Sequence, residues 1–296
     1  MEHYRVLYLD TFTTQPFVGN PCAVFPNAVG LSDEQMQAIA REVNLSETAF
    51  VFPSVQADFR VRYFSPREEI PFAGHPTIAT AFALALEDLV ALQEPITTIE
   101  LEFRIGILPV DIHVENRQPV NVVMTHQVPT FGQCFTAEQV APCFHLDVSD
   151  LRSDCPPQVV STGVPFLIVP ALDVGVLGKA QMDRKALSAL CERASVSAVF
   201  MFSIGGFQPM ADTHARLFDP DGAAEDPFTG SASGAMGAYA VYYELKQGPS
   251  LVAEQGHFVG RPGMGLLEIV GPPHQIESIR LGGAAVKVLE GSVFIA

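Results

Sequence analysis

Most hydrophobic residues of this chain fall in short runs that either alternate with polar residues or stay apolar for four to eight positions. Runs of this kind predict β-strands, because successive side chains of a strand point to opposite faces of a sheet. Strands are expected at 5–10, 22–25, 49–52, 59–64, 98–103, 108–114, 120–124, 165–169, 198–202, 215–218, 251–254, 266–270, 276–281 and 284–289. The pattern predicts a chain built mainly of strands, with helices between some of them.

An amphipathic helix is expected directly after Ser32. Ser32 and Gln35 have the spacing of a capping box, and Asn44 is a suitable residue to end the helix. The apolar face of this helix consists of Met36, Ile39, Ala40 and Val43. A second helix is expected over 183–193, and a short one near 138–144.

Two further helices are expected to be apolar on every side. The first begins near Thr77 and ends near Glu87, and the second begins near Ala232 in a run of small residues. A helix that is apolar all round belongs in a core. Its N-terminus presents unpaired N–H groups and a partial positive charge, which suit an anion such as a carboxylate. Thr229 or Ser231 can cap the second of these helices.

Three sequence patterns occur in the same order in both halves of the chain. They are an E-x-P-F-x-G loop, an R-x-F-x-P segment and a G-x-P segment that continues into an apolar run and ends in proline. The matched segments are 69–74 with 225–230, 62–66 with 216–220, and 19–26 with 163–170. Each match is short, but their common order indicates a duplicated domain of about half the chain.

The duplication sets the expected fold class and domain limits. We expect an α+β protein with two pseudo-symmetric halves, each a mostly antiparallel, barrel-like sheet around one central buried helix. The first half is expected at 1–127, a connection at 128–160 and the second half at 161–296. The C-terminal strand is able to pack back on the first half.

Composition and charge exclude several classes of partner. The chain has 296 residues, of which 48% are hydrophobic and 17% are charged, and its formal net charge is −16. Such a charge repels phosphate backbones and anionic lipid surfaces, so neither nucleic acid nor a membrane is an expected partner. The start lacks the basic and apolar regions of a signal peptide, and the apolar stretch 78–86 is too short to span a bilayer. We expect a cytoplasmic protein.

The spacing of cysteines and histidines does not indicate a metal site. The five cysteines are widely spaced without a C-x-x-C pair, and none of the eight histidines falls in an H-x-x-x-H pattern. His75 has no second ligand-type neighbour at helical spacing. We expect neither a disulfide framework nor a bound metal.

Several motifs together resemble the phenazine-biosynthesis isomerase (PhzF-like) family over essentially the whole chain. They are G-N-P-C-A-V-F at 19–25, N-L-S-E-T-A-F at 44–50, E-I-P-F-A-G-H-P-T at 69–77, E-D-P-F-T-G-S-A at 225–232 and G-R-P at 260–262. The resemblance implies the diaminopimelate epimerase fold. In that fold the active site lies in a cleft between the halves, where the N-termini of the two central helices face one another.

The resemblance also implies roles for individual residues. The general acid/base glutamate of the family corresponds to Glu47, its histidine to His75, its aspartate to Asp226 and its serine to Ser231. Moving a proton between carbons needs one group that takes and returns it, and a carboxylate desolvated in a closing cleft acquires the raised pKa that this step requires.

The expected substrate is a small molecule that carries a carboxylate. Backbone N–H groups of Gly74 and His75, and of Gly230 and Ser231, would stabilise its developing negative charge. His75 and Asp226 would orient its polar groups. No cofactor is expected, and we expect a homodimer.

Two alternatives from other functional classes remain open at this point. A non-catalytic binder of small molecules could keep the same cleft without turnover. The segment 230–234 also matches the G-x-S-x-G nucleophile elbow of serine hydrolases, with Ser233 as the nucleophile. That elbow requires a strand that leads directly into the serine, and the preceding residues, 219–227, are not a strand pattern. A two-thiol racemase is disfavoured, because neither E-x-P-F-x-G loop contains a cysteine.

Overall fold

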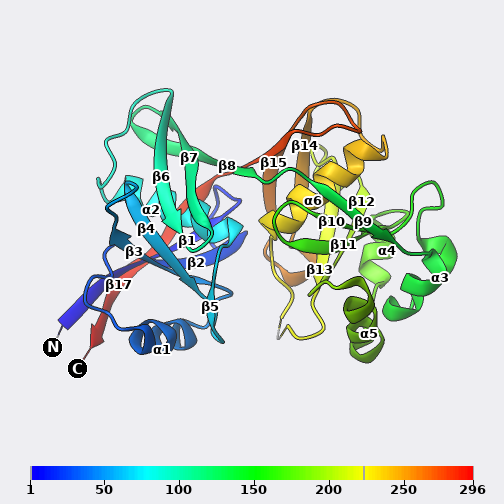
Figure 1. Cartoon of the computed structure of the whole chain (residues 1–296), viewed down its shortest axis with the longest axis horizontal. Coiled ribbons are helices and arrows are strands. Elements are labelled where there is room, and N and C mark those ends of the chain that lie inside the picture. The colour runs from blue at the N-terminus through cyan, green and yellow to red at the C-terminus, as the bar shows by residue number, and fades with distance from the viewer. Residues whose placement is uncertain (1, 223, 296) are drawn as a thin grey trace. The chain divides into compact units, whose positions relative to one another are not determined.

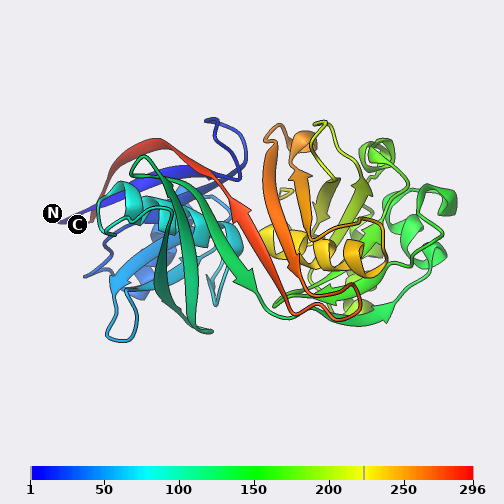
Figure 2. The same cartoon turned by 90° about the horizontal axis from the view of Figure 1, so that it is seen from above.

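The computed structural model describes residues 2–222 and 224–295, which form two compact units. Unit 1 consists of Met1–Met124 and Gly282–Ala296, and unit 2 of Thr125–Leu281. Figures 1 and 2 show the strands and helices of each unit from two directions. The end of the chain therefore belongs to the same unit as its beginning.

Unit 1 is a mixed sheet with one central helix and one outer helix. Its elements are β1 (Glu2–Thr11), β2 (Asn20–Phe25), α1 (Asp33–Val43), β3 (Thr48–Pro53), β4 (Phe59–Phe64), β5 (Glu69–Ile70), α2 (Gly74–Leu86), β6 (Ile96–Phe103), β7 (Gly106–Glu115), β8 (Gln118–His126) and β17 (Ala285–Ile295). Strand β1 pairs antiparallel with β17 and β2. The pairs that follow are β2–β3 parallel, β3–β4 antiparallel, β4–β6 parallel and β6–β7 antiparallel.

Unit 2 repeats this plan. Its elements are β9 (Thr130–Cys134), α3 (Ala137–Val140), η1 (Ala141–Phe144), η2 (Val148–Asp150), β10 (Gln158–Ser161), β11 (Pro165–Pro170), α4 (Val174–Lys179), α5 (Arg184–Ala194), β12 (Val199–Ile204), β13 (Thr213–Phe218), α6 (Gly230–Tyr242), β14 (Ser250–Gln255), η3 (His257–Val259), β15 (Gly263–Val270) and β16 (Ser278–Gly283). Strand β10 pairs antiparallel with β9 and β11. The pairs that follow are β11–β12 parallel, β12–β13 antiparallel, β13–β14 parallel and β14–β15 antiparallel.

The order of parallel and antiparallel pairs is thus the same in the two units, and the expected α+β class with two similar halves is confirmed. Helix α2 follows β4 in unit 1, and α6 follows β13 in unit 2; each has 13 residues. They begin at Gly74 and Gly230, two to three residues earlier than the sequence pattern predicts.

Each central helix lies inside the sheet of its own unit. Helix α2 contacts β1, β2, β3, β7 and β17, and α6 contacts β10, β11, β12, β14 and β15. Figure 2 shows α6 lying among the strands of unit 2. All residues of α2 from Gly74 to Ala85 are buried, because alanine and other apolar side chains cover every face of this helix. The helix N-termini are therefore held in fixed positions.

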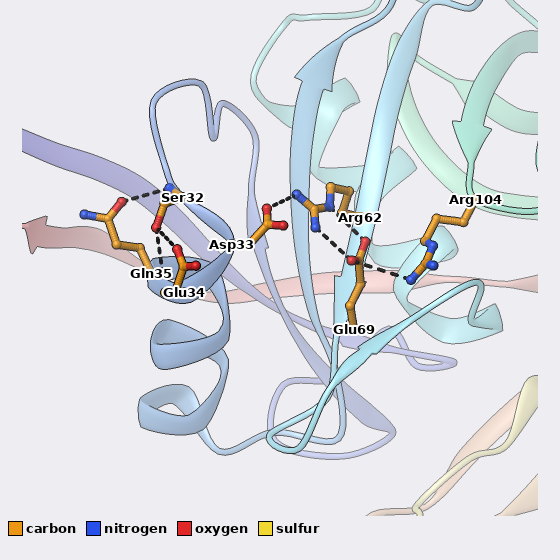
Figure 3. Close-up of polar contacts among 7 residues, drawn as sticks. All are labelled: Ser32, Asp33, Glu34, Gln35, Arg62, Glu69 and Arg104. Atoms are coloured by element: carbon orange, nitrogen blue, oxygen red, sulfur yellow. Dashed lines mark hydrogen bonds and ion pairs between the residues drawn. The ribbon is translucent and has the colours of Figure 1, made fainter.

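Helix α1 begins and ends where the sequence predicts. Ser32 N–H donates to Gln35 Oε1 at 2.8 Å, and Gln35 N–H donates to Ser32 Oγ at 3.3 Å, which completes the capping box (Figure 3). Asn44 ends the helix in the left-handed conformation, with φ of 51°. These contacts fix the chain direction that leads into β3.

The segment expected as a connection, 128–160, is part of unit 2. It carries β9, α3 and β10, and its apolar side chains enter the core of that unit. Phe135 and Phe144 pack with Leu187 and Met201 in one hydrophobic cluster. Polar residues and prolines interrupt the hydrophobic pattern of this segment, so periodicity alone does not predict that its large apolar side chains lie in a core. Periodicity also does not predict the short elements α4 and β5.

Within the described residues, every helix is too short or too polar to cross a lipid bilayer.

Candidate active site

An arginine–glutamate pair braces the loop before each central helix. In unit 1, Arg62 Nε and Nη2 donate to the two carboxylate oxygens of Glu69 at 2.8 and 2.7 Å, and Arg62 Nη1 donates to Asp33 at 2.6 Å (Figure 3). In unit 2, Arg216 Nε and Nη2 donate to Glu225 at 3.0 and 2.7 Å. Bidentate pairs of this kind are short and directional. The glutamate of each E-x-P-F-x-G loop is thus a structural residue that holds the loop in front of the helix.

His75 is the second residue of α2 and is 5% exposed. Its Nδ1 lies 3.2 Å from the amide nitrogen of Asn20, at the start of β2. Burial lowers the pKa of His75 to about 3, and a backbone hydrogen bond with Pro21 opposes this shift. The imidazole is therefore neutral near pH 7.

Glu47 lies directly before β3, in the turn that follows α1. Its Oε2 is 3.3 Å from Nε2 of His75, and its side chain is 21% exposed. The geometry of this contact is not that of a hydrogen bond, and His75 Nε2 has no hydrogen-bond partner within the described part of the chain. A buried ring nitrogen without a hydrogen-bond partner is unfavourable. A ligand that binds beside the Glu47 carboxyl group could form this missing hydrogen bond with His75 Nε2.

Two titratable groups near Glu47, Cys22 and Tyr63, are uncharged. Burial and the nearby charge of Glu47 raise the pKa of the Cys22 thiol, which is fully buried in β2 and stays protonated. Burial also raises the pKa of Tyr63, whose hydroxyl hydrogen-bonds with Thr77 Oγ1 at 2.9 Å. Cys22 is therefore a core residue and not a nucleophile.

In unit 2, Asp226 lies in the turn that leads into α6. Its Oδ2 accepts a hydrogen bond from Thr229 Oγ1 at 2.6 Å. The side chain of Gln255, which is 1% exposed, accepts from Thr229 N–H at 2.9 Å and donates to the Asp226 carbonyl at 2.8 Å. Thr229 is the N-cap residue of α6, but its hydroxyl is held by Asp226 and makes no side-chain cap.

The two helix N-termini have no side-chain cap among the described residues, because the N-cap residues Ala73 and Thr229 make no such bond. The first N–H groups belong to Gly74 and His75 in α2, and to Gly230 and Ser231 in α6. Uncapped N–H groups at the end of a buried helix favour an anion.

Unit 2 has no carboxylate at the position that corresponds to Glu47. The offset that relates the two E-x-P-F-x-G loops places Ser231 where the first half has His75. The pairing registers of β12 with β11 and of β3 with β2 place Ala198 in the position of Glu47. Val164 likewise stands in the position of Asn20. Of the two duplicated positions, only that of unit 1 carries a carboxylate beside a histidine.

Ser233 does not lie at a nucleophile elbow. It is 1% exposed and is the fourth residue of α6. The described residues immediately before α6 form turns and bends, and none belongs to a strand. The serine hydrolase alternative therefore lacks the strand-to-helix turn that would expose its nucleophile.

Sequence reasoning missed two residues that position the site. Asn20 lies within the G-N-P motif, so its contact with His75 could have been suspected from that motif. Gln255 has no comparable signal, because it lies 26 residues from Thr229 and meets it only through the fold.

Gln255 gives a first prediction. Gln255→Leu should lower the free energy of unfolding by about 1–3 kcal/mol, because it leaves the part-buried Thr229 N–H and Asp226 carbonyl without their partner. Urea denaturation measures this change. The exposed Gln247→Leu is the matched control and should leave stability nearly unchanged. Equal stability of the two variants would show that the Gln255 contacts do not hold the turn.

The neutral state of His75 gives a second prediction. The unfolded chain binds a proton at His75 with a pKa near 6.5, whereas the folded chain does so only at about 3. The stability linked to neutral His75 is therefore complete above pH 6.5 and is lost as the pH falls toward 3. Its slope is about 1.4 kcal/mol per pH unit. His75→Gln should flatten the dependence of unfolding free energy on pH below 6.5; an unchanged slope would contradict the assignment.

The chain is similar to known proteins over nearly its whole length. The family model described as phenazine biosynthesis-like protein matches residues 9–291. An uncharacterized isomerase of Clostridium acetobutylicum is 33% identical over 305 residues, covering 100% of this chain and 99% of that protein. The trans-2,3-dihydro-3-hydroxyanthranilate isomerase of Pseudomonas aeruginosa is 30% identical, covering 99% of this chain and 100% of that protein.

The solved structure of a PhzF-family phenazine biosynthesis protein from Bacillus anthracis has a TM-score of 0.90 and 31% identity, and the match covers 100% of both chains. The expected fold class is confirmed by this likeness, and the expected class of enzyme, an isomerase, by the named relatives. The chain belongs to the phenazine biosynthesis-like (PhzC-PhzF) protein family.

Proposed function

We propose that this protein is a cofactor-independent isomerase that moves a proton between two carbons of a small, carboxylate-bearing substrate. Glu47 is the general acid/base. The observation that carries the proposal is the contact of 3.3 Å between Glu47 Oε2 and Nε2 of the buried, neutral His75. The relative from Pseudomonas aeruginosa, named for isomerisation of trans-2,3-dihydro-3-hydroxyanthranilate, supports a substrate of this class.

The protonation state of His75 matters for the reaction. An imidazolium beside Glu47 would favour the ionised carboxylate and reduce its tendency to accept a proton. A neutral imidazole leaves that basicity in place. In the tautomer in which Nδ1 accepts from Asn20, the ring proton lies on Nε2 and can be donated to the substrate.

The proton transfer is balanced within the substrate and Glu47. The carboxylate takes a proton from one substrate carbon, and the electron pair of the broken C–H bond delocalises into the substrate's π-system. Glu47 then returns a proton to another carbon, where a new C–H bond forms. One base is sufficient, and this agrees with Ala198 standing at the duplicated position.

Substrate binding is assigned to the uncapped helix ends and their neighbours. The N–H groups of Gly74 and His75 can bind the negative charge that develops during proton transfer. In unit 2, we assign Asp226, Gly230 and Ser231 to the substrate's polar groups. Because Asp226 is held by Thr229, its carboxylate direction is set before substrate binds.

The direct test is an isomerisation assay without added metal or nucleotide. The purified chain is incubated with trans-2,3-dihydro-3-hydroxyanthranilate and a panel of related unsaturated carboxylates, and products are followed by NMR. The proposal predicts conversion of at least one of these carboxylates to an isomer of equal mass. Binding of panel members without conversion of any would favour the alternative of a non-catalytic small-molecule binder.

A further inference from the structure

A second polar cluster is buried in unit 2 and takes no part in the proposed reaction. Its members are His214 in β13, Glu254 in β14 and His257 in η3. His214 and Glu254 are register partners in the parallel pair β13–β14. His257 follows Glu254 by three residues, just beyond the end of β14. The fold thus brings His214 beside Glu254, from which it is 40 residues away in the sequence.

The three side chains offer their ligand-type atoms to one small volume. His214 Nδ1 lies 2.8 Å from Glu254 Oε2, and His257 Nε2 lies 3.7 Å from Glu254 Oε1. One ligand atom from each residue lies within 4.8 Å of the other two. Neighbouring ligands around one ion at about 2.1 Å are about 3.0–3.4 Å apart. The His214–Glu254 separation of 2.8 Å is shorter than this range, and the His257–Glu254 separation of 3.7 Å is longer.

The carboxylate of Glu254 is fixed, and one of its oxygens has room for another partner. Oε2 accepts from Phe207 N–H at 2.7 Å and contacts His214, whereas Oε1 accepts only from Gln208 N–H at 3.1 Å within the described residues. The free side of Oε1 has His257 as its neighbour. Backbone donors that orient a ligating carboxylate in this way are typical of metal sites.

The cluster is also largely buried from solvent. The side chains of His214 and Glu254 are 0% exposed, and that of His257 is 20% exposed. The other ring nitrogens, His214 Nε2 and His257 Nδ1, have no hydrogen-bond partner among the described residues. The Phe207 ring stacks on His257 at 4.5 Å and meets the edge of His214 at 5.0 Å. An anionic carboxylate in such apolar surroundings favours a nearby positive charge.

We propose that His214, Glu254 and His257 bind one divalent transition-metal ion of the zinc class. Two imidazoles and one carboxylate are a donor set that Zn²⁺ accepts, and they leave a further coordination position for water. A bound ion would join β13 to the connection between β14 and β15. That connection follows Gln255, whose side chain donates to the carbonyl of Asp226.

The test uses the full-length chain without an affinity tag. The protein is stripped with EDTA, equilibrated with Zn²⁺ or Co²⁺, and separated from free metal before analysis by mass spectrometry and visible absorption. The proposal predicts about one bound ion per chain, with a Co²⁺ absorption band of nitrogen and oxygen ligands. It also predicts a higher melting temperature with Zn²⁺.

Variants separate this site from surface binding. His257→Ala should lower Zn²⁺ affinity by about tenfold or more and abolish the Zn²⁺-dependent rise in melting temperature. The exposed His3→Ala is the matched control and should bind like the wild type. A circular dichroism spectrum without metal checks that each variant is folded. Less than stoichiometric binding by the wild type, or equal binding by His257→Ala and the wild type, would overturn the proposal in favour of an ion-free carboxylate–imidazole cluster.

Discussion

Replacing Glu47 by glutamine is expected to lower kcat by about 10²–10⁴-fold, the usual contribution of a positioned general acid/base. The amide keeps the shape of the side chain and its place beside His75 but cannot accept and return a proton. Fold and ligand affinity should change little, because Glu47 is partly exposed and precedes β3 without belonging to it. Steady-state kinetics and a binding titration measure the two effects separately.

The matched control is Glu42→Gln, an exposed glutamate in α1 that should retain wild-type activity. Full activity of Glu47→Gln would remove the basis of the proposed mechanism. Loss of activity in Ser233→Ala alone would instead favour the hydrolase alternative, despite the burial of Ser233.

Replacing His75 by alanine is expected to lower kcat/KM by about 10²–10³-fold, the cost of removing one preorganised donor from a site of developing charge. Both kcat and KM should change, because His75 is proposed to contact the substrate in the ground state and in the transition state. His75→Gln supplies an amide donor and should recover part of the rate. Since burial lowers the pKa of His75 to about 3, its titration should not appear in the pH profile of kcat/KM above pH 5.

The exposed His3→Ala serves again as control and should have wild-type kinetics. A rate unchanged in His75→Ala would show that the contact with Glu47 is structural. If kcat/KM of the wild type changed with pH near 6.5 and that change disappeared in His75→Gln, the pKa of His75 would be close to its ordinary value of 6.5.

Local signals predicted the elements whose ends are set by neighbouring residues. The capping box of Ser32 and Gln35 fixed the start of α1, because both partners lie within one helical turn. The central helices were found because their composition demands burial on every side. The matched arginine and glutamate of each half proved to be bonded to each other, so the duplication extends to side-chain contacts.

Contacts between distant segments could not be predicted in the same way. The position of Gln255 against Thr229 depends on where β14 runs relative to α6. The pairing of His214 with Glu254 depends on the register of β13 with β14, across 40 residues of sequence. The E-x-x-H spacing at 254–257 was the one available signal, and two ligand-type residues alone do not specify a metal site.

The resemblance, and not the residue pattern, identified Glu47. A glutamate in a polar turn before a strand usually faces water, and no periodicity distinguishes this one. The structure adds the reason for its special position, since the turn after α1 brings its carboxyl group to the buried imidazole at the start of α2. The corresponding turn of unit 2 ends in Ala198, so the two similar units differ in whether this position has a carboxylate.

The most direct measurement of the central claim is the transfer of deuterium from solvent. The isomerisation is run in D₂O with the carboxylate identified by the assay, and the product is analysed by NMR and mass spectrometry. A single carboxylate that exchanges its proton with solvent between taking and returning it should place deuterium on the newly protonated carbon in the wild type. Glu47→Gln should still bind the substrate but incorporate deuterium about 10²–10⁴-fold more slowly. Incorporation by Glu47→Gln at the wild-type rate would contradict the assignment of Glu47 as the group that moves the proton.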